Sequence, residues 1–267
     1  MNIPDADQDY IYSELLKLRN QYPNIQIGFT VITGSDSYGF KSENSDHDIR
    51  GVFHYNAKDQ LKLFNNKQSN FNYTLEEKYD FVLTEVNNFI KNIVRMNCTT
   101  LEQLFSPFII NCASPFEKLK NIVGNNLASK GIYESYHGMA IFNYKHYIES
   151  ESKATIKKWL YVIRAYLSGI YALKYCKIEQ NILSLLAASL VNYDQCRLID
   201  DLVVMKLHNK EDSPVTDYKL LKEELLKLRE DLNHRLETCY KESKLPKEPT
   251  EIFKDYLDYW IVDLRND

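Results

Sequence analysis

A nine-residue run of mainly β-branched and aromatic side chains, Ile25–Thr33 (IQIGFTVIT), constrains the fold more than any other stretch. A run of this length and composition is typical of a buried strand. The strand is expected to end at Gly34-Ser35, where a residue without Cβ lets the backbone approach a ligand closely. Asp48–His54 (DIRGVFH) predicts a second strand, so the first half of the chain is expected to contain a sheet.

The two halves of the chain differ in their hydrophobic patterns. Helical stripes at 10–20 and in the segment after Thr84 flank three predicted strands, the third at Tyr73–Leu83. From about Pro115 onward almost every pattern is helical. The pattern therefore predicts an α+β domain at 1–125, built on a sheet with flanking helices, followed by an all-α domain at 126–267.

Composition narrows the class of protein. Apolar residues make up 44% and charged residues 26% of the 267 residues, which is the mix of a globular protein. No apolar run is long enough to cross a bilayer and the N-terminus is acidic, so we expect a cytoplasmic protein without a membrane partner. Five scattered cysteines, with no C-x-x-C pair, favour reduced thiols over a zinc site. A net charge of −4 argues against a generic nucleic-acid coat and leaves a local basic groove open.

The stretch 34–52 (GSDSYGFKSENSDHDIRGV) carries the chemistry. Backbone amides after Gly34 are expected to suit a phosphate, and the Ser35 hydroxyl can donate to one. Asp46 and Asp48 stand at i and i+2 of a strand, which places both on one face. Such a pair repels itself unless a cation lies between, and its hard oxygens select Mg²⁺ or Mn²⁺. For the separate pieces a solvated turn is the favoured interpretation, but their order and context favour a site for a triphosphate and a metal.

These motifs resemble a known family. GS-x-x-x-G followed by SD-x-D is similar to the signature of the DNA polymerase beta superfamily of nucleotidyltransferases. The longer form, together with softer motifs at Leu101–Pro107, Tyr136–Tyr147 and Lys157–Arg164, resembles its RNA-repair-pathway group. The resemblance covers about 25–169. It implies a polymerase-beta-like mixed sheet and a metal-dependent enzyme.

The resemblance also implies site residues. Gly34 and Ser35 would bind phosphate, and Asp46 and Asp48 would bind metal. A third metal-binding and catalytic carboxylate is expected on the neighbouring strand, where Asp80 is preferred over Glu76 and Glu77 on strand periodicity. This third carboxylate is the candidate for accepting the proton of the incoming hydroxyl.

Three nearby residues complete the motif. Asp36 stands where many relatives carry a basic residue, and its charge would weaken triphosphate binding unless it faces away. Two roles are considered equally for Arg50: it could bind substrate phosphates, or it could form a structural salt bridge with one of the aspartates. His47 is expected on the opposite strand face, as a packing or solvent-facing residue.

A basic helix is predicted at Ser152–Tyr175. Resemblance suggests that it closes over the nucleotide, with Lys158 and Arg164 holding phosphates and Tyr161 stacking on a base or ribose. A solvated charged face is the competing interpretation.

The resemblance implies transfer of a nucleoside monophosphate from an NTP to an acceptor hydroxyl, with release of pyrophosphate. An RNA 3′ end is the favoured acceptor, and a protein or small-molecule hydroxyl stays open. The alternative is a non-catalytic nucleotide-binding or antitoxin-like regulator that keeps the fold. A missing carboxylate would mark that alternative, and here at least two are present.

Overall fold

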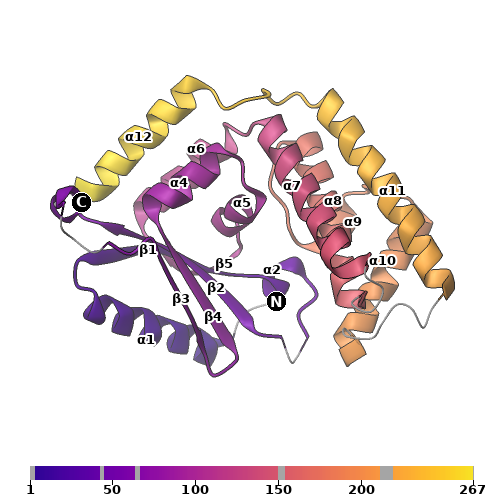
Figure 1. Cartoon of the computed structure of the whole chain (residues 1–267), viewed down its shortest axis with the longest axis horizontal. Helices are drawn as coiled ribbons and strands as arrows, with labels where there is room; N and C mark the ends of the chain where they lie inside the picture. Colours follow the sequence, from indigo (N-terminus) through magenta and orange to yellow (C-terminus); the bar gives the residue numbers. More distant parts are fainter. Residues whose placement is uncertain (1–3, 43–44, 64–66, 150–153, 211–218, 267) are drawn as a thin grey trace.

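A five-stranded sheet lies beside a group of helices in the computed structural model, which describes residues 4–42, 45–63, 67–149, 154–210 and 219–266 (Figure 1). The strand order is β3-β4-β2-β1-β5. β2 and β4 run parallel, and the other neighbours are antiparallel, so the predicted mixed sheet is confirmed. The strands are β1 (Ile25–Thr33), β2 (His47–Tyr55), β3 (Asn70–Leu75), β4 (Tyr79–Glu85) and β5 (Phe108–Cys112).

The first two predicted strands are confirmed, and the third is wrong. β1 has the predicted bounds, and β2 exceeds its prediction by one residue at each end. The third segment is a hairpin, in which β3 and β4 pair across a turn holding Glu76 and Glu77, each with φ of 53°. Edge strand β5 was not predicted.

Most of the described residues outside the sheet are in helices. The predicted first helix is confirmed as α1, and the predicted basic helix as α8, whose first turn is capped by the Thr155 side chain. The predicted start of that helix at Ser152 lies outside the described residues. The helices are α1 (Asp5–Gln21), α2 (Ser35–Tyr38), α3 (Ala57–Leu61), α4 (Val86–Val94), α5 (Cys98–Leu104), α6 (Ser114–Gly124), α7 (Ser129–Asn143), η1 (Tyr144–Ile148), α8 (Ile156–Tyr175), α9 (Ile182–Ala187), α10 (Tyr193–Met205), η3 (Lys206–Lys210), α11 (Lys219–Glu242) and α12 (Glu251–Asn266).

Each face of the sheet has its own core. On one face α1 buries Ile11, Leu15 and Leu18 against the sheet. On the other face Phe29 and Val31 of β1 join a larger core that runs through α4 and α5 into α7, α8 and α11. Because both faces are covered, β1 is apolar along most of its length rather than alternating.

The C-terminal helix returns to the first half of the chain (Figure 1). In α12 the indole of Trp260 donates to the Pro115 carbonyl over 2.8 Å, and its ring meets Phe116 edge-on. Arg265 pairs with Glu85 at 2.7 Å and donates to the Tyr55 carbonyl. The segment after α11 therefore crosses from the helical group back to the sheet.

The domain boundary expected near residue 125 falls between α6 and α7. The larger core continues across this point, and α12 packs against α4 and α6. Separately, no helix within the described ranges combines the length and the apolar character needed to span a bilayer.

Candidate active site

Gly34 ends β1 at the position where the backbone meets Asp48. It has φ of +63°, a conformation that costs little only for glycine. A Cβ at this position would lie 2.7 Å from Asp48 Cγ and would overlap Asp48 Oδ2. Register explains the approach, because Thr33 of β1 faces Asp48 of β2 across the antiparallel pair. The turn after β1 thus lies in direct contact with a carboxylate.

Asp48 and Asp80 are partners across the parallel pair β2–β4, and Arg50 joins them. Arg50 Nη2 lies 2.5 Å from Asp48 Oδ1 and 3.0 Å from Asp80 Oδ2. Its Nη1 donates to the Asp80 carbonyl over 2.9 Å. The structure therefore contains the salt-bridge arrangement of Arg50 with both aspartates.

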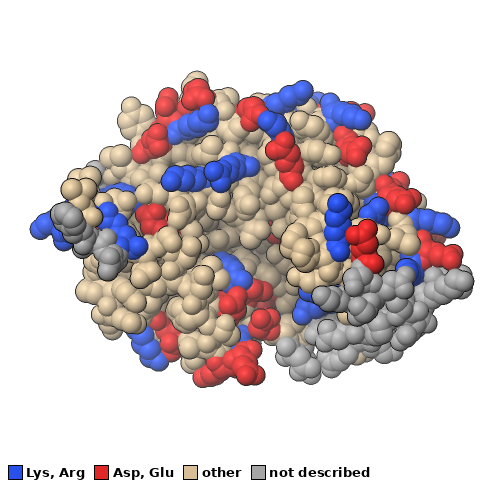
Figure 2. Space-filling view, in the orientation of Figure 1, with Lys and Arg blue, Asp and Glu red and all other residues tan. Residues whose placement is uncertain are grey.

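Asp46 precedes β2 and is exposed, whereas Asp48 is partly buried. Burial raises the pKa of Asp48; Arg50 opposes this rise, while Asp46, Asp80 and Asp36 add to it. Of these carboxylates, Asp80 is the one that lies directly across from Asp48 on the neighbouring strand. Figure 2 shows acidic side chains gathered near the lower ends of the strands, with basic groups among them.

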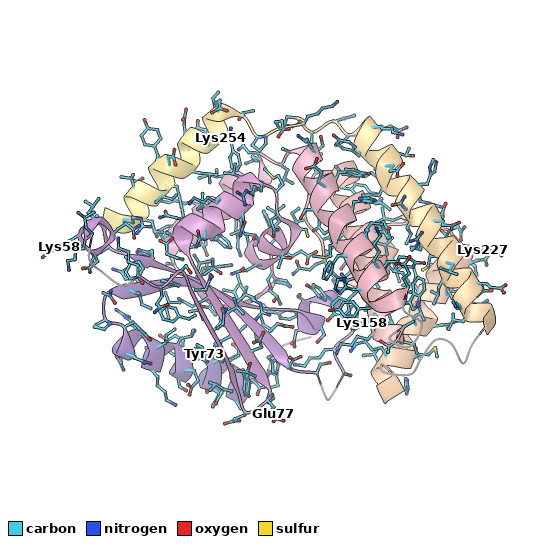
Figure 3. All side chains as sticks on the ribbon, in the orientation of Figure 1. Lys58, Tyr73, Glu77, Lys158, Lys227 and Lys254 are labelled. Atoms are coloured by element: carbon cyan, nitrogen blue, oxygen red, sulfur yellow. The ribbon has the colours of Figure 1, made fainter. Side chains whose placement is uncertain are left out.

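Asp80 lies beside Asp48, and the two alternative acids do not. Glu76 and Glu77 stand in the β3–β4 turn, and Figure 3 shows Glu77 at the outer tip of that hairpin. Strand periodicity does not apply to Glu76, because residue 76 is in the turn between β3 and β4 and not in a strand. Asp80 also accepts a 3.4 Å hydrogen bond from Thr74 Oγ1.

The carboxylates of Asp46, Asp48 and Asp80 are the groups that could bind a divalent cation here. Among the described residues, no three His, Cys, Asp or Glu side chains are arranged as a metal site. Arg50 instead bridges Asp48 and Asp80, so an ion could bind these two only if the guanidinium releases an oxygen. Two features nonetheless fit a cation: the oxygens are of the hard type that Mg²⁺ and Mn²⁺ prefer, and Gly34 keeps the space beside Asp48 free of a Cβ.

Asp36 has partners beside the site. Its Oδ1 lies 2.9 Å from Lys41 Nζ, and its Oδ2 lies 3.2 Å from His47 Nδ1. The ring of His47 is buried and stacks on Tyr79, with ring centroids 5.6 Å apart. Asp36 is therefore directed into a local ion-pair network.

Ser35 follows Gly34 as the first residue of α2 and is buried. The turn that it begins closes on Gly34, whose carbonyl accepts bonds from the Tyr38 amide and the Ser37 hydroxyl. The role of Ser35 toward phosphate stays a prediction.

Helix α8 carries Tyr161, which packs against α2, and Lys158, which is labelled in Figure 3. The ring of Tyr161 meets Tyr38 and Phe40 edge-on, with centroids 5.9 and 5.8 Å apart. Lys158 lies one turn earlier, with Nζ 3.9 Å from the centroid of the Tyr147 ring. Both side chains are partly buried.

Arg164 occupies a different environment from the one expected. Its side chain is 1% exposed, pairs with Glu102 of α5 at 2.7 Å, and lies 3.7 Å from the centroid of the Tyr38 ring. A guanidinium buried in this way does not reach the solvent where a triphosphate would lie. This geometry is at odds with the expectation that Arg164 contacts a phosphate directly. Arg164 instead packs on the Tyr38 ring at the end of α2.

Three residues that contact the predicted site residues were not identified from the sequence. Glu102 lies 62 residues before Arg164 and reads as an ordinary helical acid. Tyr38 and Lys41 fall inside the recognised motif, but nothing in their spacing indicates an ion pair or a stacked guanidinium. Their roles depend on contacts between elements distant in the sequence.

The mixed sheet, with a glycine turn against paired aspartates, is that of the polymerase-beta type of nucleotidyltransferase, a class of enzymes. The chain matches the RNA repair pathway DNA polymerase beta family over residues 8–263, and it belongs to that family. The match is wider than the 25–169 expected from motifs.

Two relatives extend the comparison. Uncharacterized protein MJ0002 of Methanocaldococcus jannaschii is 28% identical over 228 residues, which are 85% of this chain and 89% of that protein. Uncharacterized protein YcgL of Bacillus subtilis (strain 168) is 24% identical over 159 residues, or 59% and 60% of the two chains. A crystal structure of a nucleotidyltransferase-like protein from Exiguobacterium sibiricum 255-15 covers 86% of this chain and 73% of its own, at 14% identity. Its TM-score of 0.31 is too low to carry an argument.

Proposed function

We propose that this enzyme transfers a nucleoside monophosphate from an NTP to an acceptor hydroxyl and releases pyrophosphate. The observation that supports it best is the contact between Gly34 and Asp48. A backbone turn suited to phosphate lies against a carboxylate, and that carboxylate faces a second one, Asp80, on the next strand. Phosphoryl transfer needs chiefly this kind of positioning and charge compensation.

The proposed reaction forms one P–O bond and breaks another, and a side chain of this protein takes up the proton. The acceptor oxygen attacks the α-phosphorus and forms a new P–O bond, while the bond to the α–β bridging oxygen breaks. Pyrophosphate leaves with that electron pair. Asp80 would accept the hydroxyl proton, since its carboxylate is partly exposed and lies across from Asp48 on the next strand.

Asp46, Asp48 and Asp80 would hold Mg²⁺ or Mn²⁺. A bound ion of this kind compensates the phosphate charge and lowers the pKa of the attacking hydroxyl. For the ion to reach Asp48, Arg50 must move from the carboxylates, and its guanidinium is then available to a phosphate oxygen. Arg50 would thus serve both the metal-free protein and the substrate complex.

The nucleotide would lie beside the contact between α2 and α8, where Tyr38 meets Tyr161. Gly34 and Ser35 would face the phosphates, Lys158 would add a positive charge, and Tyr161 would offer a ring face to base or ribose. Arg164 takes a supporting role in this proposal, because it fixes Tyr38 at the end of α2. In domain terms, 1–125 would carry the catalytic residues and 126–267 the nucleotide-closing helices, with α12 packed on the first part.

We favour an RNA 3′ end as the acceptor, on the ground that the family is described as an RNA repair pathway family. A protein or small-molecule hydroxyl remains the other acceptor class. The net charge of −4 means that an RNA would have to be bound by a local basic surface and not by the protein's total charge.

The test is an acceptor screen. The protein is incubated with Mg²⁺ or Mn²⁺, with each of the four NTPs labelled at the α-phosphate, and with RNA carrying either a 3′-hydroxyl or a 3′-phosphate, or with protein. Label on RNA that requires the 3′-hydroxyl supports the proposal. Label on protein moves the acceptor to that class. Nucleotide binding without any label transfer would support the regulator instead.

A further inference from the structure

The surroundings of Asp36 pose a problem of charge for a site that takes a polyphosphate. Asp36 stands two residues after Gly34, whose backbone contacts the Asp48 carboxylate. Asp36 lies in the first turn of α2, the short helix that begins directly after Gly34. An uncompensated negative charge here would repel a triphosphate.

The structure supplies a compensating cation from the following loop. Lys41 Nζ lies 2.9 Å from Asp36 Oδ1, and the two side chains are only 19% and 8% exposed. Because both groups are largely withdrawn from water, their interaction is screened less than that of a surface pair. Lys41 is held here and is not a freely moving surface lysine.

His47 fixes the pair from the side of the sheet. Its ring nitrogens Nδ1 and Nε2 each lie 2.9 Å from Lys41 Nζ, and Nδ1 lies 3.2 Å from Asp36 Oδ2. On its other side Nε2 lies 3.5 Å from Asp7 Oδ2 of α1, which also pairs with Lys78 at 2.7 Å. The network therefore joins α1, α2 and β2 around Asp36.

We propose that Lys41, held by Asp36 and His47, is a positioning residue that cancels the charge of Asp36 beside the carboxylate site and so lets that site accept a polyphosphate. Lys41 acts through Asp36 and does not touch the substrate. This inference rests on the proposed function and extends it, because it names the device by which this chain tolerates an acid after Gly34-Ser35.

An electrostatic role of Lys41 has a consequence for binding that a purely structural role does not have. Removing the positive charge of Lys41 should weaken binding of an anion and strengthen binding of a cation at the same site. Removing the negative charge of Asp36 should do the reverse. A variant that merely loosens the loop would weaken both, so the opposite signs identify the electrostatic role.

The experiment is calorimetry on the full chain with two probes, Mn²⁺ alone and inorganic tripolyphosphate in EDTA. Lys41→Met is expected to weaken tripolyphosphate binding by about 10-fold and to tighten Mn²⁺ binding by a smaller factor. Asp36→Asn should shift both constants the other way. The double variant Lys41→Met/Asp36→Asn should return both near wild type, since the charges cancel again.

Lys17→Met is the matched control. Lys17 pairs with Glu14 at 2.5 Å on the surface of α1, so the variant loses the same charge away from the site. Both constants should stay at the wild-type values. The Lys41→Met shifts should also shrink at high salt, as screened charges require.

The outcomes are distinct. If Lys41→Met weakens tripolyphosphate and the double variant stays equally weak, Lys41 touches the phosphate and the inference is overturned. Shifts of both probes in the same direction, or no shift, also overturn it. If wild type binds neither probe, the inference is overturned, because the site then accepts no polyphosphate. The proposed function is judged separately, by label transfer from NTP in the presence of Mg²⁺ or Mn²⁺.

Discussion

The backbone of Gly34 lies against the carboxylate of Asp48, so closely that a Cβ on residue 34 would overlap Asp48 Oδ2. Gly34 also has φ of +63°, which side chains rarely adopt. The glycine is therefore required twice, once by conformation and once by space. Asp48, which Gly34 contacts, is one of the proposed metal ligands. Glycine is therefore required at residue 34 for the site as well as for the fold.

Gly34→Ala is expected to abolish transfer, because the new methyl group displaces the Asp48 carboxylate. The strained backbone should also cost about 1–3 kcal/mol of unfolding free energy. The check is a transfer assay together with denaturant unfolding. Gly138→Ala is the control, since a Cβ there meets nothing within 4 Å in the middle of α7. It should keep activity and gain up to about 1 kcal/mol. An active Gly34→Ala would contradict the geometry.

Lys158→Ala is expected to weaken NTP binding by about 10- to 150-fold, the range for loss of one charge-assisted hydrogen bond of roughly 1.5–3 kcal/mol. Calorimetric titration with each NTP and Mg²⁺ measures it. Lys174→Ala serves for comparison, because Lys174 lies in the last turn of the same helix, α8, and should leave the dissociation constant unchanged. Equal NTP dissociation constants for wild type and Lys158→Ala would show that Lys158 does not bind the nucleotide.

Arg164→Met is expected to destabilise the protein by about 3–5 kcal/mol, since it leaves the Glu102 carboxylate buried without its partner. The double variant Arg164→Met/Glu102→Gln should recover most of that loss and should bind NTP nearly as well as wild type. Thermal unfolding and calorimetry on both variants decide this. A stable double variant with NTP affinity still reduced tenfold or more would mean that Arg164 does contact the nucleotide.

The sequence indicated the centre of the site better than its surroundings. β1 and β2 were predictable because a strand that is mostly buried leaves a run of β-branched and aromatic residues in the sequence. The β3–β4 turn was missed because Glu76 and Glu77 replace the usual Gly or Asn at positive φ. β5 was missed because a five-residue, half-buried edge strand gives little signal. Arg164 looked solvent-facing because nothing in a helical charge pattern reveals a carboxylate partner on a distant helix.

Acid is expected to destabilise the fold through His54. Burial lowers the pKa of His54 below its ordinary value, with the carbonyl of Tyr55 and the carboxylate of Glu85 opposing that shift and Arg265 adding to it. The unfolded chain therefore binds the proton more readily than the folded one. Stability from this group is present above the unfolded pKa, about 6.5, and falls as pH drops below it toward the folded pKa.

The check is Tm between pH 8 and pH 5 for wild type and His54→Gln. The variant should lose less Tm on acidification than wild type. His234→Gln, at an exposed position on α11, should follow the wild-type curve. Parallel curves for wild type and His54→Gln would show that other groups set the acid sensitivity.

Asp48, beside Gly34, is proposed to carry nucleotidyl transfer, and a comparison of wild type with Asp48→Asn tests this role. Wild type and Asp48→Asn are incubated with Mg²⁺, RNA and NTP labelled at either the α- or the γ-phosphate. We predict that wild type moves only the α-label to RNA and releases the γ-label as pyrophosphate, while Asp48→Asn moves none. The fold raises the pKa of Asp48 and so disfavours its charge, which means that Asp48→Asn should keep or raise Tm. A folded Asp48→Asn that transfers the α-label at the wild-type rate, or transfer of the γ-label by wild type, would contradict the account.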